Sequence, residues 1–128
     1  MNSLTAGGKL AGSILDALAE ATTDAPGITR VAYGPGERFA HDLVRDEAEK
    51  LGATAHVDAA GNLYLTLKGR SPDLPAIVIG SHLDSVPHGG NFDGAAGVVA
   101  GLAVMAELVG QGIQLPRDLI VLATRAEE

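Results

Sequence analysis

One histidine and four carboxylates are the residues of this sequence best suited to chemistry. His82 and Asp84 stand in the stretch GSHLDSVPHGGNFDG, Asp93 stands near its end, and Glu127 and Glu128 are the last two residues. The sequence contains no cysteine, so a transition-metal site must use His and carboxylates. That donor set suits zinc, manganese, cobalt or nickel.

These residue types could activate water. Water on a divalent ion has its pKa lowered from 15.7 toward about 7. Asp93 has two carboxylate oxygens and could bridge two ions. A neighbouring carboxylate that is not a ligand could take the proton of the water. Asp84 lies two residues after His82, so an extended chain points both side chains the same way. Asp84 could then accept the free ring N–H of His82 and fix its tautomer.

Three elements must position these groups. The apolar run at 76–80 predicts a buried strand, residues 94–109 predict a long apolar helix, and residues 118–124 predict a second buried strand. This order is a βαβ unit, whose two strands should be parallel with a right-handed crossover.

Ligands of open α/β sheets bind beyond the carboxyl ends of the strands. His82 and Asp84 follow the first strand, the two glutamates follow the second, and Asp93 stands where the helix begins. The topology therefore predicts that residues distant in the sequence converge at one edge of the sheet.

The first half of the chain completes one α/β domain with a mixed sheet. Helices are predicted at about 9–21 and 37–51 from their apolar spacing. The runs at 54–58 and 63–69 flank the turn AAGN and predict a hairpin. We find no internal repeat and no linker, so residues 1–128 are expected to form a single unit.

Composition excludes several classes of partner. The chain has 128 residues, 46% hydrophobic residues and a formal net charge of −7. A negative charge argues against nucleic acid, which is bound by Lys and Arg. No stretch is long enough to cross a membrane, and the N-terminus lacks the apolar run of a signal peptide. A cytoplasmic location is the expectation.

Each candidate residue also has a simpler explanation. Asp93 is a good helix N-cap, and a terminal pair of glutamates is most often only a solvated end. Three other histidines are expected to be structural: His41 on a helix surface, His56 on the hairpin and His88 exposed, with possible access to substrate. It is the joint occurrence at one edge that favours a site.

The stretch GSHLDSVPHGGNFDGAAGVVAGLAVMAEL resembles the hydantoinase/carbamoylase family of metal-dependent amidohydrolases. This family includes N-carbamoyl-L-amino acid hydrolases, β-ureidopropionases and allantoate amidohydrolases. It is related to the aminoacylases and dinuclear zinc exopeptidases. The likeness extends upstream through GITRVAYGPGERFAHDLVRDEAEKLG and DAAGNLYLTLKG and downstream to the final EE. The motif GGNFDG and the short gap from His82 to Asp93 are similar to the carbamoylase branch.

The resemblance implies a role for each candidate residue. His82 would ligate one of two divalent ions (Zn, or Mn, Co or Ni), Asp93 would bridge both, and Glu128 would ligate the second. Glu127 would be the general base and acid, and Asp84 would orient His82. The implied reaction is hydrolysis of a linear amide or carbamoyl C–N bond in a small amino-acid-like substrate.

The resemblance also implies a longer protein. Family members continue well past the paired glutamates, and they usually approach that pair by a shorter segment than TRAEE and follow it with glycine. Residues 1–128 would be the N-terminal part of a zinc-exopeptidase-like catalytic domain. Two further His ligands and a lid domain that forms a homodimer would lie elsewhere, so this chain alone is expected to be inactive. We also expect the last strand to leave its outer edge unpaired.

Two alternative functions remain open. The first is an aminopeptidase or aminoacylase with a dinuclear zinc site, which keeps the metal chemistry and changes the substrate. The second is a truncated, non-enzymatic binding or assembly protein.

Overall fold

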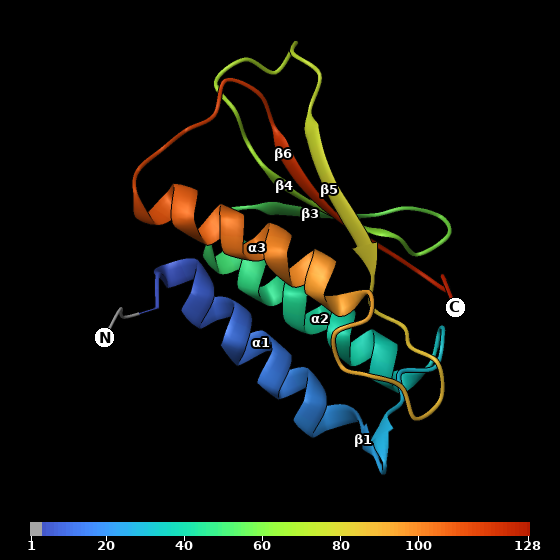
Figure 1. Ribbon diagram of the computed structural model, residues 1–128. Helices are drawn as coiled ribbons and strands as arrows, with labels where there is room; N and C mark the ends of the chain where they lie inside the picture. The colour runs from blue at the N-terminus through green and yellow to red at the C-terminus, as the bar shows by residue number, and fades with distance from the viewer. Residues whose placement is uncertain (1–3) are drawn as a thin grey trace.

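A computed structural model of the chain describes residues 4–128 (Figure 1). Three helices and a four-stranded sheet make up most of it, together with a two-stranded pair after the first helix. In chain order the elements are α1 (Ala6–Thr22), β1 (Thr23–Asp24), β2 (Gly27–Ile28), α2 (Pro35–Lys50), β3 (Thr54–Val57), β4 (Leu63–Leu67), β5 (Ile77–His82), α3 (Ala95–Gly110) and β6 (Leu119–Thr124).

The sheet is mixed and has the strand order β3-β4-β6-β5. β3 and β4 form the expected antiparallel hairpin, β4 pairs antiparallel with β6, and β5 pairs parallel with β6. The segment β5-α3-β6 is thus the predicted βαβ unit, and the α/β fold class is confirmed. Within residues 4–128, every helix falls short of the length and apolarity that membrane crossing requires.

The position of β6 differs from the expectation. The last strand was expected to leave its outer edge unpaired, but β6 lies between β4 and β5 and both of its edges are paired. The outer strands of the sheet are β3 and β5, and Val78 on β5 is 55% exposed. The sequence order of the strands misled this prediction, because β6 inserts between two strands that precede it in the chain.

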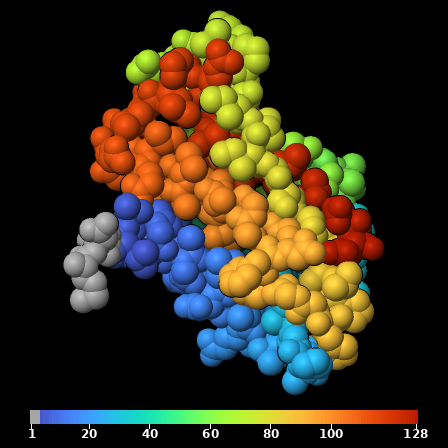
Figure 2. Space-filling model, in the orientation of Figure 1, coloured from blue at the N-terminus to red at the C-terminus, as the bar shows by residue number. Residues whose placement is uncertain are grey.

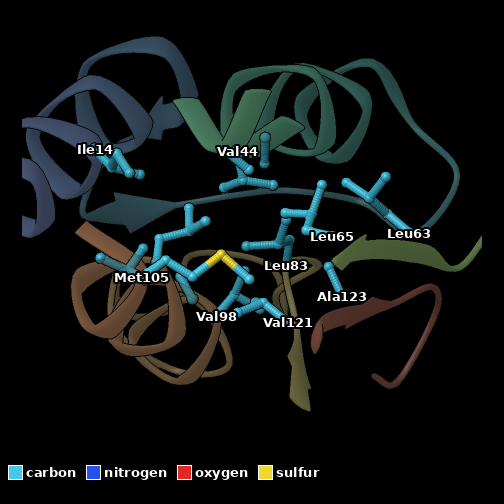
Figure 3. Close-up of a cluster of buried hydrophobic side chains, with 14 of the residues drawn as sticks. Ile14, Val44, Leu63, Leu65, Leu83, Val98, Met105, Val121 and Ala123 are labelled. Carbon is cyan, nitrogen blue, oxygen red and sulfur yellow. The ribbon is translucent and has the colours of Figure 1, made fainter. Parts of the chain in front are cut away.

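The helices pack on one face of the sheet, and α1 packs mainly on α3 (Figure 1). Alternate residues of β6, Leu119, Val121 and Ala123, are buried beneath the helices. They join Ile14, Val44, Leu65, Val98 and Met105 in one apolar core (Figure 3). This core contains no aromatic ring.

Two glycines let α3 lie close to the sheet. A Cβ on Gly97 would come within 2.7 Å of the Ser81 Cβ, and one on Gly101 within 2.6 Å of a Val121 methyl. Both distances are shorter than atoms tolerate. The close approach keeps the start of α3, and with it the segment before the helix, next to the end of β5.

Candidate metal centre

The two parallel strands end side by side and fix the frame of the site. In the register of β5 and β6, His82 lies opposite Thr124. The segment after β6 therefore passes directly beside the segment after β5, and Figure 2 shows the red end of the chain against the yellow and gold residues that follow β5. The segments that follow the two strands therefore converge at this edge of the sheet, as predicted.

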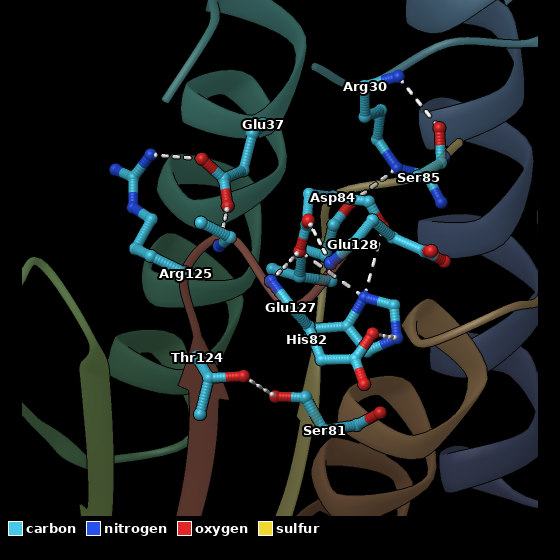
Figure 4. A network of polar contacts seen from close by, with 12 residues as sticks. Arg30, Glu37, Ser81, His82, Asp84, Ser85, Thr124, Arg125, Glu127 and Glu128 are labelled. Carbon is cyan, nitrogen blue, oxygen red and sulfur yellow. Dashed lines mark hydrogen bonds and ion pairs between the residues drawn. The ribbon is translucent and has the colours of Figure 1, made fainter. Parts of the chain in front are cut away.

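His82, Asp93, Glu127 and Glu128 meet at this edge (Figure 4 shows all but Asp93 labelled). The His82 Nε2 atom lies 3.7 Å from Asp93 Oδ1 and 3.5 Å from Glu127 Oε2. One ligand atom each from His82, Asp93 and Glu128 lie within 4.8 Å of one another. The His82 side chain is 10% exposed, whereas those of Asp93 and Glu127 are 68% and 59% exposed. The centre thus has a buried imidazole and an acidic, open side.

The donor atoms of this cluster are of the kinds that bind a divalent cation. One imidazole nitrogen and carboxylate oxygens are ligands that Zn²⁺ and its neighbours accept. Several carboxylates around one imidazole place like charges close together, and such an arrangement is unfavourable unless a positive charge offsets it. His82, Asp93 and Glu128 would hold the ion.

Asp84 connects the histidine to both glutamates. Its side chain is fully buried, and its carboxylate accepts backbone N–H bonds from Glu127 at 3.2 Å and from Glu128 at 2.9 Å. The His82 Nδ1 atom lies 3.1 Å from the Asp84 carbonyl oxygen and 3.3 Å from its Oδ1. A proton on Nδ1 can be donated to these acceptors, which leaves Nε2 free to face Asp93 and Glu127.

A tight turn at Gly94 presents Asp93. Gly94 has φ 68° and ψ −54°, and the Ala95 N–H donates to the Asp93 carbonyl at 2.8 Å. These values describe a γ-turn of the rare, strained form. Gly94, not Asp93, occupies the N-cap position of α3, and no side chain caps the helix. The simpler explanation of Asp93 as a helix cap is therefore wrong.

Glu37 and Arg125 form a buried ion pair that the sequence did not indicate. Glu37 lies in the first turn of α2, with its side chain fully buried, and Arg125 follows β6. The Arg125 Nη1 atom donates to Glu37 Oε2 at 2.7 Å (Figure 4). A glutamate in the first turn of a helix is expected at the surface beside the helix dipole. No local sequence pattern indicates that Glu37 pairs with a residue 88 positions away.

Arg30 is the second missed residue, and it holds the loop after β5. It is fully buried, and it donates from Nε to the Leu83 carbonyl at 2.7 Å and from Nη1 to Asn91 Oδ1 at 3.0 Å. Its backbone N–H donates to Ser85 Oγ. Burial lowers the pKa of Arg30, and the nearby charge of Asp84 opposes this shift. The loop that carries Asp84 is thus anchored to the segment before α2.

His41 was expected on a helix surface, and this expectation is wrong. The side chain is buried, and its Nε2 atom has no hydrogen-bond partner among residues 4–128. Burial first, and the positive charge of Arg125 second, lower its pKa from 6.5 to about 4. His41 is therefore neutral at pH 7. His56 lies on β3 and His88 is exposed, as expected.

The turn residues behave as predicted and contribute to the site. Asp58 accepts N–H bonds from Ala60 and Asn62, and Gly61 has φ 91°. The Asn62 Oδ1 atom accepts the backbone N–H of Arg125 at 2.9 Å. The hairpin turn therefore supports the segment that leads to Glu127 and Glu128.

Comparison with known proteins shows the family of the chain. The family model described as peptidase family M28 matches residues 62–128, just over half of the chain. An N-carbamoyl-L-amino acid amidohydrolase of Geobacillus stearothermophilus is 40% identical over 102 residues, which are 80% of this chain and 25% of that protein. A ureidoglycolate hydrolase of Arabidopsis thaliana is 33% identical over 103 residues, 80% of this chain and 22% of that protein.

A solved structure gives the same result for the fold. A hydantoinase/carbamoylase family amidase from Burkholderia ambifaria superposes with a TM-score of 0.88 at 36% identity, over 95% of this chain and 30% of that one. The chain spans about a quarter of the length of the curated relatives it matches. These matches confirm the resemblance to the hydantoinase/carbamoylase amidohydrolases, and the chain belongs to peptidase family M28.

Proposed function

We propose that the full-length protein hydrolyses a linear amide or carbamoyl C–N bond in a small amino-acid-like substrate, with two divalent metal ions. The observation that carries the proposal is the cluster of His82, Asp93 and Glu128, with Glu127 beside it. The names of the relatives, amidohydrolases of N-carbamoyl amino acids and of ureidoglycolate, support the substrate class.

In this proposal His82, Asp93 and Glu128 would hold the metal ions, and Asp93 would contribute to both. Divalent ions supply Lewis acidity, which lowers the pKa of water and polarises a carbonyl group. Additional ligands would come from outside this chain, since three ligands do not complete two sites. We propose that residues 1–128 form the N-terminal part of the catalytic domain.

Glu127 is the proposed general base and acid. Its carboxylate is 59% exposed and lies 3.5 Å from His82 Nε2, so a substrate can reach it beside the metal ligands. Glu127 would accept a proton from the attacking water and return it to the nitrogen that leaves when the C–N bond breaks. Asp84 would hold His82 in the tautomer that frees Nε2 and would fix the backbone of both glutamates.

The partners follow from the same proposal. A small amide is the substrate, and a second copy of the protein is the proposed partner in a homodimer. The net charge of −7 supports a small molecule over nucleic acid.

The test is a substrate panel on the purified full-length protein. It compares N-carbamoyl amino acids, ureido acids, N-acyl amino acids and dipeptides, before and after chelation and with Zn²⁺, Mn²⁺, Co²⁺ or Ni²⁺ restored. We expect turnover of carbamoyl or ureido substrates that chelation abolishes and metal restores. Full activity of the metal-stripped protein would refute the proposal.

A second candidate is hydrolysis of dipeptides, and the match to a peptidase family model favours it. The same panel separates the two functions. A preference for dipeptides over N-carbamoyl amino acids would support the peptidase, and the metal site would keep its role.

A further inference from the structure

We propose that the buried pair of Glu37 and Arg125 is a positioning device that sets Glu127 and Glu128 against His82. This inference rests on the proposed function, because it gives the pair a role in that same site. Among the polar contacts that the structure describes, neither side chain bonds to the side chain of a candidate ligand. Both act through the backbone between Arg125 and Glu128.

Glu37 receives donors from two sides. Its Oε2 atom accepts Arg125 Nη1 at 2.7 Å and the Tyr33 N–H at 2.5 Å, and its Oε1 atom accepts the Ala126 N–H at 3.3 Å. The carboxylate is therefore bonded to the two residues that precede Glu127. A fully buried carboxylate with three donors has little freedom to move.

Arg125 has several partners besides Glu37. Its backbone N–H donates to Asn62 Oδ1, its Nε atom to the Gly61 carbonyl at 3.3 Å, and its guanidinium lies 5.6 Å from the Tyr33 ring centre. The side chain points away from His82 toward α2 (Figure 4). Arg125 thus anchors the segment after β6 to both α2 and the hairpin turn, instead of facing a substrate.

The backbone at Ala126 shows why an anchor is needed. Ala126 has φ 53°, in the left-handed region that residues with a Cβ disfavour. Such a conformation persists only where the surroundings enforce it. The Glu37 carboxylate bonds Ala126 on one side, and Asp84 bonds the N–H groups of Glu127 and Glu128 on the other. The two buried carboxylates together define the path of the four residues from 125 to 128.

The decisive variant replaces both partners. In the double variant Glu37→Met and Arg125→Met, no buried charge is left unpaired, and replacing a buried ion pair by apolar residues often leaves stability unchanged. The bonds from the pair to the Ala126 N–H, the Tyr33 N–H and the Gly61 carbonyl are lost. A merely structural pair predicts a normal metal site in this variant, whereas a positioning pair predicts a defective one.

The measurement is Co²⁺ affinity of the metal-stripped full-length protein, from its visible absorption in competition with a chelator. We expect the double variant to unfold at a temperature close to that of the unaltered protein and to bind Co²⁺ about 10- to 100-fold more weakly. With a substrate from the panel, kcat should fall by a similar factor while KM changes little. Lys50→Met, which removes an exposed ion pair with Glu47 on the same helix, is the matched control and should change neither quantity.

Arg125→Lys is measured in parallel, so the result does not depend on the double variant folding. It keeps the charge beside Glu37 and loses the fork that also reaches Gly61, so its Co²⁺ affinity should fall less than that of the double variant and more than that of Lys50→Met. Unchanged affinity in both Arg125 variants would overturn the inference. Failure of the unaltered protein to take up Co²⁺ would instead refute the proposed function.

Discussion

Replacing Gly94 by alanine should damage the proposed metal centre although no proposed ligand is substituted. Gly94 sits in the γ-turn that presents Asp93, and a Cβ built on it lies 2.5 Å from two atoms of the His82 ring and 2.6 Å from a third. The ring has little freedom to move aside, since its Nδ1 atom is held by Asp84. Gly94→Ala should therefore displace His82, Asp93 or both.

The cost can be worked from two contributions. An alanine in the left-handed region costs about 1–2 kcal/mol. Relieving the overlap between the new methyl group and the buried His82 ring costs about 1–3 kcal/mol, the usual range for over-packing. Together these lower the free energy of unfolding by roughly 2–5 kcal/mol. The affinity for metal should fall as well, because the surviving fold has a shifted histidine or aspartate.

The assay combines denaturant unfolding with the Co²⁺ competition titration on the full-length protein. Gly90→Ala is the matched control, because Gly90 lies in the same loop, has a φ outside the left-handed region and has nothing within 4 Å of its added Cβ. The control should change stability by no more than about 0.5 kcal/mol. If Gly94→Ala matches Gly90→Ala in both stability and Co²⁺ affinity, the close packing of Gly94 on His82 is not what shapes the site.

Three further predictions concern single side chains. Asp84→Asn should weaken Co²⁺ binding about 10- to 100-fold in the competition titration. The variant removes the negative charge beside His82 and replaces one acceptor oxygen by an N–H donor. An unchanged Co²⁺ affinity would contradict this prediction. Glu127→Gln should keep its bound metal, measured by elemental analysis, while its kcat falls about 10²- to 10⁴-fold, as expected for the loss of a general base. A loss of metal from this variant would instead indicate that Glu127 is a ligand. His41 has a folded pKa of about 4 against 6.5 unfolded, so its contribution to stability is present above pH 6.5 and is lost as the pH falls to 4. His41→Leu should therefore remove roughly 3 kcal/mol of the acid-induced loss between these pH values in denaturant unfolding, and an unchanged pH profile would show that His41 is not held neutral.

Local patterns in the sequence were sufficient to predict the frame of the site. The apolar runs of β5 and β6 and the helix between them fix a βαβ unit, and its topology alone brings His82 beside the final glutamates. The hairpin turn could be predicted equally well, since it has a local backbone requirement. Element bounds were less exact: α1 begins at Ala6 and α2 at Pro35, and the short β1–β2 pair was not predicted.

Buried polar residues were the part that the sequence did not reveal. Glu37 and His41 lie one turn apart on α2, on a helix whose composition suggests a solvated face. The partner of Glu37 is Arg125, which reaches it only after the last strand enters the sheet. The charge of Arg125 also acts on His41. Arg30 was missed for the same reason, because its partners Leu83 and Asn91 lie more than 50 residues away. Long-range pairing of this kind has no periodic signal.

The central position of β6 also constrains how the chain folds during synthesis. β4 and β5 are made first, but they do not pair with each other, because β6 lies between them. On the ribosome the emerging chain can form its helices and the β3–β4 hairpin early, whereas β5 has no strand to pair with until residues 119–124 leave the exit tunnel. Inserting β6 between β4 and β5 requires contacts between segments distant in the sequence, and such contacts are slow to form. The same insertion brings the final glutamates to His82, so the step that completes the sheet also brings these candidate residues together.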